Sequence, residues 1–381
     1  MRTTRIALVP AVVLAMCAAA CSGSKPTESG ESAGAFKPVA PPSDQAPAAA
    51  PAAKAGAIDL QGAGATFPYP LYSKWVAEYQ KANANVRINY QSIGSGGGIR
   101  QITERTVDFG ASDAPLTDEE QAKAPGKLIH IPTTLGAVVV SYNLPGVTEL
   151  KLSPEAIAGI FLGDIKSWDD AKLKKLNPDA KLPKQPISVA YRSDGSGTTA
   201  VFTQYLSSVS PTWKGKVGAG KSVKFPTGLG AKGNEGVAGQ LKTTPGSVGY
   251  IELAYAKQTK QPYATVQNKA GKFVDASLES ISAAAASVAD SMPDDMRVSI
   301  VDAPGEQAYP IAAFTYILVY EDQKDATKGK AMAEFLWWAI HDGQQFGPDL
   351  HYAKLPPQVV TKIEGKLHAL TAAGHPLLPS S

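Results

Sequence analysis

The sequence predicts an α/β protein with a mostly parallel sheet that has helices on both faces. From Asp59 onward, apolar segments typical of strands alternate with amphipathic segments typical of helices, and no internal repeat is visible. The chain has 381 residues, of which 44% are hydrophobic and 19% charged, so it can bury a sizeable core and form more than one compact unit. In such an alternation, parallel strands lie side by side and the connecting helices cover the sheet.

The first 20 residues have the layout of a secretory signal. Arg2 and Arg5 precede an apolar stretch, and small residues follow it. Pro10 interrupts the apolar stretch, which is shorter than the roughly 20 residues that a membrane-spanning helix needs. We therefore expect residues 1–20 to be a signal peptide and the protein to be exported to the periplasm or cell envelope.

Cys21 is a candidate for lipidation. The letters AAAC at 18–21 resemble a bacterial lipobox, in which the cysteine becomes the lipidated first residue of the mature chain, although Ala18 stands where that pattern usually has leucine. This resemblance predicts a membrane anchor at Cys21. Two alternatives remain: plain cleavage that leaves Cys21 unmodified, and lipidation at Cys17, whose preceding methionine is a poor cleavage residue.

Residues 21–57 are expected to form a disordered tether behind the lipidated cysteine. From Ser22 to Ala57 the chain is mostly Ala, Pro, Gly and Ser, and such a composition cannot bury enough apolar area to offset its conformational entropy. A tether of this kind suits a protein that works near a membrane but must move.

Cysteine content argues against a domain held by disulfides or by cysteine-bound metal, and net charge argues against a nucleic-acid-binding protein. No cysteine follows residue 21, so the exported domain has neither an internal disulfide nor a cysteine metal site. Removal of the signal takes two of the 37 basic residues and none of the 34 acidic ones, which leaves one positive charge in excess. That balance argues against a nucleic-acid-binding surface.

The predicted elements follow in order after a strand that begins near Asp59. Segment 66–80 places its large apolar residues on one helical face and its prolines in the first turn, and Ser153 and Pro154 are typical of a helix start. The further segments are strand 86–93, helix 96–105, strand 107–113, strands 128–132 and 137–144, helix 153–162, strand 186–191, helix 200–206, segment 233–244, strand 247–254, a less regular alanine-rich stretch near 280, strand 311–320 and helix 331–340.

Four short stretches share one pattern that indicates an anion site. Residues 62–68, 92–98, 110–115 and 192–199 each follow a predicted strand, are rich in small residues and hydroxyls, and in three cases lead directly into a helix. Unpaired N–H groups and a partial positive charge at a helix N-terminus attract anions, and glycines let the backbone approach closely. In open α/β sheets, ligands lie at the carboxyl ends of the strands. Thr66, Ser95, Ser196 and Thr198 would add O–H donors, and Arg192 a charged fork suited to oxyanions.

Each stretch taken alone has a plainer explanation. A Gly/Ser loop before a helix is usually only a turn and a cap. Arg192 alone would more often form a structural ion pair, Asp113 could cap the segment that follows it, and Asp194 could cap a helix as readily as orient Arg192. The interpretation therefore depends on the recurrence of the pattern in one chain.

Longer motifs resemble the PstS-type phosphate-binding proteins, the extracytoplasmic receptors of the phosphate ABC transporter. These motifs are GAGATFPYPLYSKW, IGSGGGIRQI, TVDFGASDAPLT, RSDGSGTT and GNEGVAGQLKTTPGSVGYIE, and the resemblance runs from about Leu60 to about Leu370. It implies two α/β lobes of the type 2 periplasmic-binding-protein fold, joined by a hinge, with the ligand buried in the cleft between them. It also implies delivery of inorganic phosphate to permease and ATPase subunits of an importer, by a monomer that has no cofactor.

The resemblance also implies the phosphate-binding residues. On the first lobe they are Thr66, Phe67 through its backbone N–H, Ser95 and Asp113; on the second they are Arg192, Ser196, Gly197 and Thr198. Asp194 is placed to hold the Arg192 guanidinium. One departure is Gly96, where many relatives carry a second serine, and the change should remove at most an auxiliary hydroxyl. We expect residues 58–134 and 307–381 to form lobe one and residues 135–306 to form lobe two.

Asp113 is the residue that most needs an explanation. A carboxylate 4 Å from an anion would be repelled by about 4 kcal/mol at a protein surface. Phosphate near neutral pH still carries a proton, however, and an ionised carboxylate can accept a hydrogen bond from it, whereas sulfate carries no proton. Sites that require a particular O–H can reject the analogue without it by roughly 10⁴ to 10⁵. Asp113 is thus expected to select phosphate over sulfate.

No enzyme motif is complete, so we expect neither catalytic residues nor a metal. The letters SDGSG lack the G-x-S-x-G spacing, GAGATF lacks the third glycine of a dinucleotide fingerprint, and GSGTT lacks the lysine of a Walker loop. The histidines His130, His341, His351, His368 and His375 show no metal-ligand spacing. Trp337 and Trp338 are expected in the core. Two alternatives remain: a secreted phosphatase on the same scaffold, and a receptor for another tetrahedral oxyanion such as sulfate or molybdate.

Overall fold

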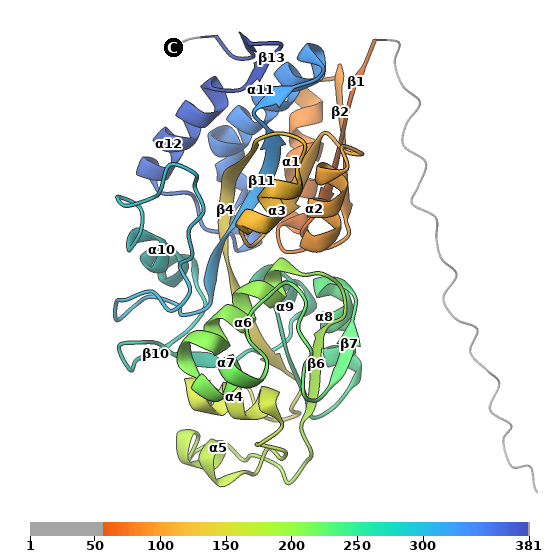
Figure 1. The fold of residues 1–381 in the computed structure, drawn as a ribbon. Helices are drawn as coiled ribbons and strands as arrows, with labels where there is room; N and C mark the ends of the chain where they lie inside the picture. Colours follow the sequence, from red (N-terminus) through yellow and green to blue (C-terminus); the bar gives the residue numbers. More distant parts are fainter. Residues whose placement is uncertain (1–55, 380–381) are drawn as a thin grey trace, which may run out of the picture. The chain divides into compact units, whose positions relative to one another are not determined.

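A computed structural model describes residues 56–379, so the signal peptide, Cys21 and the tether up to residue 55 lie outside the described residues. An eight-stranded sheet forms the centre of this part, in the order β2-β1-β3-β11-β4-β8-β6-β7 (Figure 1). Its strands are β1 (Ile58–Gly64), β2 (Val86–Ser92), β3 (Phe109–Ser112), β4 (Leu128–Tyr142), β6 (Ser188–Arg192), β7 (Leu229–Ala231), β8 (Ser247–Glu252) and β11 (Ala312–Tyr320). The α/β prediction is confirmed.

The expectation of a mostly parallel sheet is wrong in the middle of the sheet. The strands at both ends pair in parallel, β1 with β2 and β3, and β6 with β7 and β8. The central strands pair antiparallel, β11 with β3 and β4, and β4 with β8. Strands buried on both faces read as continuous apolar runs in either direction, so sequence alone did not reveal the reversal.

The two strands expected at 128–132 and 137–144 are one continuous strand, β4. All 15 of its residues are buried. The strand pairs with β11 from Leu128 to Ala137 and with β8 from Val138 to Tyr142, so it belongs to both halves of the sheet. The polar letters TT between the two apolar runs suggested a break, but Thr133 and Thr134 are buried and hydrogen-bonded through their side chains.

The helices expected at 66–80, 96–105, 153–162, 200–206 and 331–340 are present, and further helices form in segments for which no helix is predicted. In chain order the helices are α1 (Tyr69–Ala82), α2 (Ser95–Thr103), α3 (Asp118–Lys123), α4 (Pro154–Leu162), α5 (Ala171–Leu176), α6 (Gly197–Val209), α7 (Pro211–Lys216), α8 (Gly233–Thr243), α9 (Leu253–Thr259), α10 (Leu278–Ala286), α11 (Ala326–Ile340), α12 (Pro357–His368) and the 3₁₀ helices η1 (Asp342–Phe346) and η2 (Pro348–Leu350). As expected, Ser153 caps α4, where its hydroxyl accepts the Ala156 N–H at 3.3 Å. The alanine-rich stretch near 280 is the helix α10, which packs on β4 and β11.

Two small sheets complete the described structure. One has the order β10-β9-β5, formed by β5 (Lys151–Leu152), β9 (Thr265–Gln267) and β10 (Phe273–Val274). The other has the order β12-β13-β14, formed by β12 (Asp322–Gln323), β13 (Thr371–Ala372) and β14 (His375–Pro376).

The elements gather in two groups along the sheet. In Figure 1, β1, β2, α1, α2, α11 and α12 lie in the upper group, α4 to α9 with β6 and β7 lie in the lower group, and β4 runs from one to the other. The residue boundaries given above for the lobes stay a prediction. Part of segment 289–300, assigned there to lobe two, contacts elements of the upper group: Arg297 binds Asp118 and the Leu116 carbonyl, and Lys362 donates to the Met292 carbonyl.

Candidate functional site

The four Gly/Ser loops follow β1, β2, β3 and β6, and they meet where the two groups of elements face each other. Ser95 is the first residue of α2, and its Oγ accepts the Gly197 N–H at 3.0 Å and the Asp113 N–H at 3.4 Å. Beside this contact, the Gly96 N–H donates to the Gly195 carbonyl at 2.8 Å. Loops that are about 100 residues apart in sequence are therefore in direct contact.

This close approach requires a glycine at 197 and favours one at 96. A Cβ at Gly197 would lie 2.5 Å from both Asp113 Oδ2 and Ser95 Oγ, which no real side chain could tolerate. A Cβ at Gly96 would lie 3.1 Å from the Gly195 Cα, so the glycine that replaces the family's second serine gives room to the facing loop. A side chain at Gly96 would therefore need a small shift of the facing backbone at Gly195.

Asp113 lies at the centre of this contact and is buried, with 3% of its surface exposed. Its Oδ1 accepts a hydrogen bond of 2.9 Å from Thr315 Oγ1, on β11. Among the described residues its Oδ2 has no hydrogen-bonding partner, although it faces Gly197 at the start of α6. Burial raises the pKa of Asp113 to about 7, against the lowering effects of the Thr315 hydrogen bond, the Arg192 charge, the Ser95 hydroxyl and the Thr198 backbone N–H. The site therefore holds a buried carboxyl oxygen with spare capacity to accept a hydrogen bond.

Arg192 and Asp194 form the ion pair that the sequence analysis expected. Arg192 Nε and Nη2 donate to the two carboxylate oxygens of Asp194 at 2.7 and 2.6 Å, and Arg192 Nη1 lies 3.4 Å from Thr198 Oγ1. The Gly233 N–H also donates to Asp194, at 3.1 Å. Hydrogen bonds from Arg192 hold the pKa of Asp194 below its usual value, although burial opposes this. Such a bidentate pair fixes the guanidinium plane and leaves Nη1 directed toward the loop contact.

Thr66 and Thr198 are brought together by a residue that the sequence analysis did not single out, Asn234. Its Nδ2 donates to Thr66 Oγ1 at 2.7 Å and to Thr198 Oγ1 at 3.1 Å. All three residues are buried. Asn234 lies in the motif GNEGVAGQ of the family resemblance, but a lone asparagine near a helix start is typical of a cap, so its type and position alone indicate no role at the site.

Phe67 and Ser196 are also placed at the loop contact. The Phe67 ring is buried, and its carbonyl accepts a 2.6 Å hydrogen bond from Tyr352. Ser196 is the N-cap of α6, where its Oγ accepts the Thr199 N–H at 3.0 Å, and its own N–H donates to the Lys221 carbonyl. All eight expected ligand residues thus come from loops that touch or adjoin one another.

Further buried polar residues support these loops and were not predicted. Tyr255 donates to the Thr66 carbonyl at 2.6 Å, and Thr315 holds Asp113 as described above. Glu252 is fully buried, accepts from Tyr352 and from the Ala254 N–H, and burial raises its pKa well above the usual value. Thr315, Glu252 and Tyr352 stand in apolar or irregular segments, so neither their spacing nor their neighbours in sequence indicated a role.

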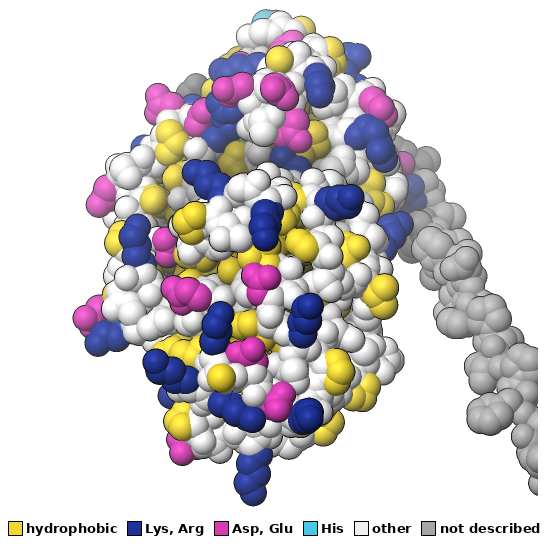
Figure 2. Space-filling view, turned by 60° about the horizontal axis from the view of Figure 1, so that its bottom comes forward, with side chains coloured by type: hydrophobic (Ala, Val, Ile, Leu, Met, Phe, Trp, Pro, Cys, Tyr) yellow, Lys and Arg dark blue, Asp and Glu magenta, His cyan; other side chains and the backbone are white. Residues whose placement is uncertain are grey.

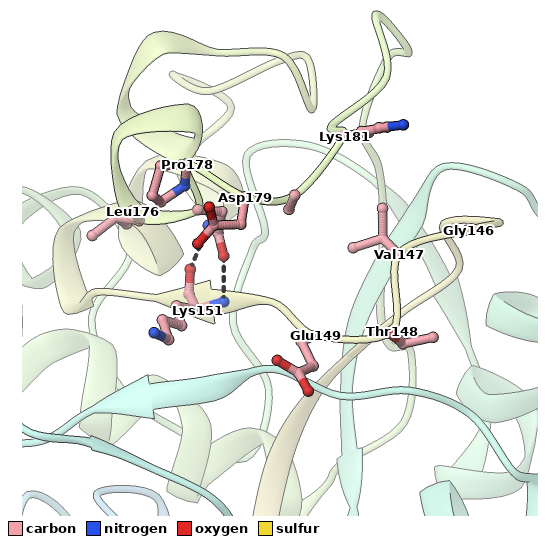
Figure 3. Close-up of a pocket in the computed structure, with 11 residues that line it drawn as sticks. Gly146, Val147, Thr148, Glu149, Lys151, Leu176, Pro178, Asp179 and Lys181 are labelled. Atoms are coloured by element: carbon pink, nitrogen blue, oxygen red, sulfur yellow. Dashed lines mark hydrogen bonds between the residues drawn. The ribbon is translucent and has the colours of Figure 1, made fainter.

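The depression in Figure 3, about 500 Å³ in volume, lies elsewhere, around Lys151 and Asp179. Asn177 in its wall already uses its side chain to accept the Lys151 N–H and to donate to the Lys151 carbonyl. The charged ends of Glu149, Lys151 and Lys181 point in different directions in Figure 3. Nothing in this depression converges on a common point, so it is not a candidate ligand site.

Other site classes find little support in the part of the chain that the structure describes. Within residues 56–379, no three His, Cys, Asp or Glu side chains are grouped so that they could hold a metal ion. No helix in that range is long and apolar enough to cross a bilayer. On the face shown in Figure 2, basic and acidic side chains are interspersed and form no basic stripe of the kind that nucleic acids require.

Two α/β groups that share one strand, with polar loops meeting between them, define a solute-binding protein of the two-lobed periplasmic class. Residues 42–342 match a family model described as "PBP superfamily domain". A phosphate-binding protein from Stenotrophomonas maltophilia superposes with a TM-score of 0.64 at 22% identity, covering 81% of this chain and 94% of that one. The predicted two-lobed periplasmic-binding-protein fold is therefore confirmed.

The sequence relatives define the family within this class. The phosphate-binding protein PstS of Xylella fastidiosa is 44% identical over 358 residues, covering 92% of this chain and 95% of the relative. PstS of Pasteurella multocida is 47% identical over 309 residues, with 81% and 89% covered. The chain belongs to the PstS family of phosphate-binding proteins, as the resemblance implied. Membership of a family of binding proteins also confirms the expectation that the chain is not an enzyme.

Proposed function

We propose that this protein binds inorganic phosphate between its two lobes and delivers it to a phosphate ABC importer. The observation that carries the proposal is Asp113, a buried carboxyl group with one unpartnered oxygen, next to the N-terminus of α6. A dianion there would meet helix N–H groups, hydroxyls and Arg192 as donors, and its remaining proton would meet Asp113 as acceptor. Family membership and the named function of the relatives support the same ligand.

The proposed ligand set is the one expected from the sequence. Four residues come from the β1, β2 and β3 loops and four from the β6 loop and the start of α6: Thr66, Phe67, Ser95, Asp113, Arg192, Ser196, Gly197 and Thr198. Asp194 orients Arg192 by accepting hydrogen bonds from its Nε and Nη2 atoms. No cofactor takes part in this proposal, since phosphate needs only donors and one acceptor.

The cellular setting is part of the same proposal. The protein is exported, is anchored by a lipid on Cys21, works as a monomer at the outer side of the membrane, and passes phosphate to permease and ATPase subunits. The signal-like residues 1–20 and the lipobox-like letters before Cys21 support this setting. Mass spectrometry of the chain from its native membrane would test it, because lipidation at Cys21 adds a diacylglycerol mass to a chain that starts at that residue.

Calorimetric titration tests the ligand assignment. Residues 58–381 should bind phosphate tightly and sulfate at least about 10⁴-fold more weakly, since sulfate would face Asp113 without a proton. Asp113→Asn should bring the affinities for the two anions much closer, because a neutral amide can donate to sulfate. Unchanged rejection of sulfate by the variant would contradict the role given to Asp113.

An enzyme assay provides an independent check that the protein is not a phosphatase. A phosphatase on this scaffold would hydrolyse a chromogenic phosphate ester and lose that activity in Ser196→Ala. We expect no turnover from the wild-type protein, because the Ser196 hydroxyl accepts the Thr199 N–H as a helix cap and no histidine is among its hydrogen-bonding partners.

A further inference from the structure

Asn234 is held in one orientation at the contact between the loops. It is fully buried and is the second residue of α8. Its Oδ1 accepts the backbone N–H of Glu252 at 2.9 Å. A backbone N–H can only donate, so the side-chain oxygen must face Glu252 and the Nδ2 group must face the two threonine hydroxyls. Both Nδ2 hydrogens are then used, one for Thr66 and one for Thr198.

The hydroxyls of Thr66 and Thr198 are consequently limited in what they can do. A hydroxyl has two acceptor positions and one hydrogen. Thr66 Oγ1 accepts from Asn234 Nδ2 at 2.7 Å and from the Asn234 backbone N–H at 3.3 Å. Thr198 Oγ1 accepts from Asn234 Nδ2 at 3.1 Å and from Arg192 Nη1 at 3.4 Å. With both acceptor positions occupied, each hydroxyl can interact with a further group only by donating its hydrogen.

We infer that Asn234 is a positioning residue for phosphate: by donating to Thr66 and Thr198 it forces one hydroxyl from each lobe to point its hydrogen at the anion. The inference rests on the proposed function, and it adds a residue to the site that is not itself a ligand. Asn234 also makes the orientation of Thr66 depend on lobe closure, because Thr66 follows β1 whereas Asn234 lies on α8. Thr198 lies on the same side of the loop contact as Asn234, so its hydroxyl is oriented before the ligand arrives and needs no reorganisation, whereas Thr66 is oriented as the lobes close.

Two substitutions test this role by titration with phosphate. Asn234→Ala removes both Nδ2 hydrogens and should weaken phosphate binding by about 10- to 100-fold, since two hydroxyls lose their fixed direction. Asn234→Asp keeps the size of the side chain and an acceptor for the Glu252 N–H, so it keeps that packing contact. Its carboxylate would attract the hydroxyl hydrogens away from the anion, and we expect a loss at least as large. If Asn234 had a purely structural role, Asn234→Asp, which is closer to asparagine in shape, should lose less phosphate affinity than Asn234→Ala.

A double-mutant cycle with Thr66→Val separates positioning from general damage. In the Thr66→Val background there is one hydroxyl fewer to orient, so either Asn234 substitution should cost clearly less affinity than in the wild type. Fully additive losses would overturn the inference. If Asn234→Ala does not fold, the cycle can be measured with Asn234→Asp alone. The charge of the aspartate repels phosphate in both backgrounds, so this repulsion cancels when the two affinity losses are compared.

Asn177 supplies a matched control. It is also buried, and its side chain likewise makes three hydrogen bonds, with the Lys151 N–H, the Lys151 carbonyl and the Leu173 carbonyl. Asn177→Ala should lower the melting temperature and leave phosphate affinity within about twofold of wild type. Equal affinity losses in Asn177→Ala and Asn234→Ala would overturn the inference. If the wild-type protein itself fails to bind phosphate, the proposed function fails first, whereas a binding wild type with an unaffected Asn234 variant refutes the inference alone.

Discussion

Asp113 shows at the level of one residue how burial and ligand choice are linked. Its carboxyl group is kept out of water by the loops that meet around it, and Thr315 satisfies only one of its oxygens. A buried group with an unused acceptor costs free energy unless a ligand hydrogen reaches it. The stability of the contact between the loops should therefore depend on whether Asp113 carries a proton.

Without phosphate, closure of the lobes should weaken as the pH rises from about 4 to about 7. In the closed form described above, burial raises the pKa of Asp113 to about 7. In an open form the exposed aspartate would have its ordinary, lower pKa. At a pH between these two pKa values, the closed form therefore holds a proton that the open form releases. The closed form is then favoured at the acidic end, by up to about 4 kcal/mol, and the effect levels off above pH 7. X-ray scattering of the ligand-free protein across this range would measure it.

Asp113→Asn is the control for this pH effect. The amide does not titrate, so the variant should keep only the pH dependence that comes from other buried groups, such as Glu252, whose pKa is raised by burial and, to a smaller extent, by the Asp113 charge. A scattering profile with the same pH dependence in the variant and the wild type would assign the effect to those groups instead of Asp113.

The sequence indicated the loops that meet in the structure, but not the residues that support those loops. The ligand loops carry glycines, hydroxyls and helix starts close together in sequence, which is a local pattern. Thr315 and Asn234 act on those loops across 202 and 168 residues of sequence, and such contacts follow from the packing of the whole chain. No single-sequence pattern contains that information.

At the level of elements, α6 connects the site to an aromatic cluster in the core. Phe202 lies one helical turn after Thr198, and its ring stacks on Tyr250 at 4.4 Å and meets Phe161 edge-on at 4.7 Å between centroids. Tyr250 in turn donates or accepts at Thr199, and it accepts the Arg192 N–H. The position of the N-terminus of α6 is therefore fixed by this packing.

Phe202→Ala should affect both stability and binding. Loss of a fully buried ring costs about 3 to 5 kcal/mol of unfolding free energy, and a shift of α6 should also weaken phosphate binding. Denaturant unfolding and calorimetry would measure the two effects. Phe335 is a control of the same size in α11, where its ring packs on Tyr79, and Phe335→Ala should lower stability with little change in affinity. Equal affinities in the two variants would show that α6 is not positioned by Phe202.

The sequence predicted helices correctly where hydrophobic periodicity and capping residues agreed. It did not predict whether neighbouring strands run parallel or antiparallel. The start of α4 was predicted because Ser153 and Pro154 are local signals. The strands β4 and β11 were recognised as apolar runs, yet their antiparallel pairing was not, since an apolar run has no direction in its composition. The continuity of β4 was hidden for a different reason, because Thr133 and Thr134 interrupt its apolar sequence.

At the level of the whole molecule, a few interactions join the loops of the two lobes. Lys221, which precedes Phe225 in the second lobe, donates from its Nζ to Glu120 at 2.7 Å and to the Pro115 carbonyl at 3.4 Å. Glu120 belongs to the capping box of α3, and the Lys221 carbonyl accepts the Ser196 N–H. This ion pair lies at the edge of the loop contact and is partly exposed.

Lys221→Met should speed phosphate release by about two- to fivefold, since partly exposed ion pairs contribute about 1 kcal/mol or less. Stopped-flow displacement of bound phosphate would measure the rate. Lys74→Met, which breaks an exposed pair with Glu78 within α1, is the control and should leave the rate unchanged. An unaltered release rate in Lys221→Met would show that this pair does not help to hold the closed form.

Phosphate should also change the dimensions of the whole protein. If ligands from both lobes contact the same anion, only the closed form satisfies all of them, and saturating phosphate should lower the radius of gyration measured by X-ray scattering. Sulfate at the same concentration should leave it unchanged. Scattering curves that do not respond to phosphate would contradict closure by the ligand.

The continuity of β4 has a mechanical consequence. Since this strand is fully buried and is hydrogen-bonded to β11 over one part and to β8 over the other, rotation of one lobe against the other must alter the twist of the strand itself. We expect β4 to deform elastically. The energy of this deformation resides in the backbone of the strand, whether or not a ligand occupies the cleft between the lobes. Each movement between the open and closed forms must therefore store or release elastic energy in β4, in addition to the energy of the contacts that the loops make or lose.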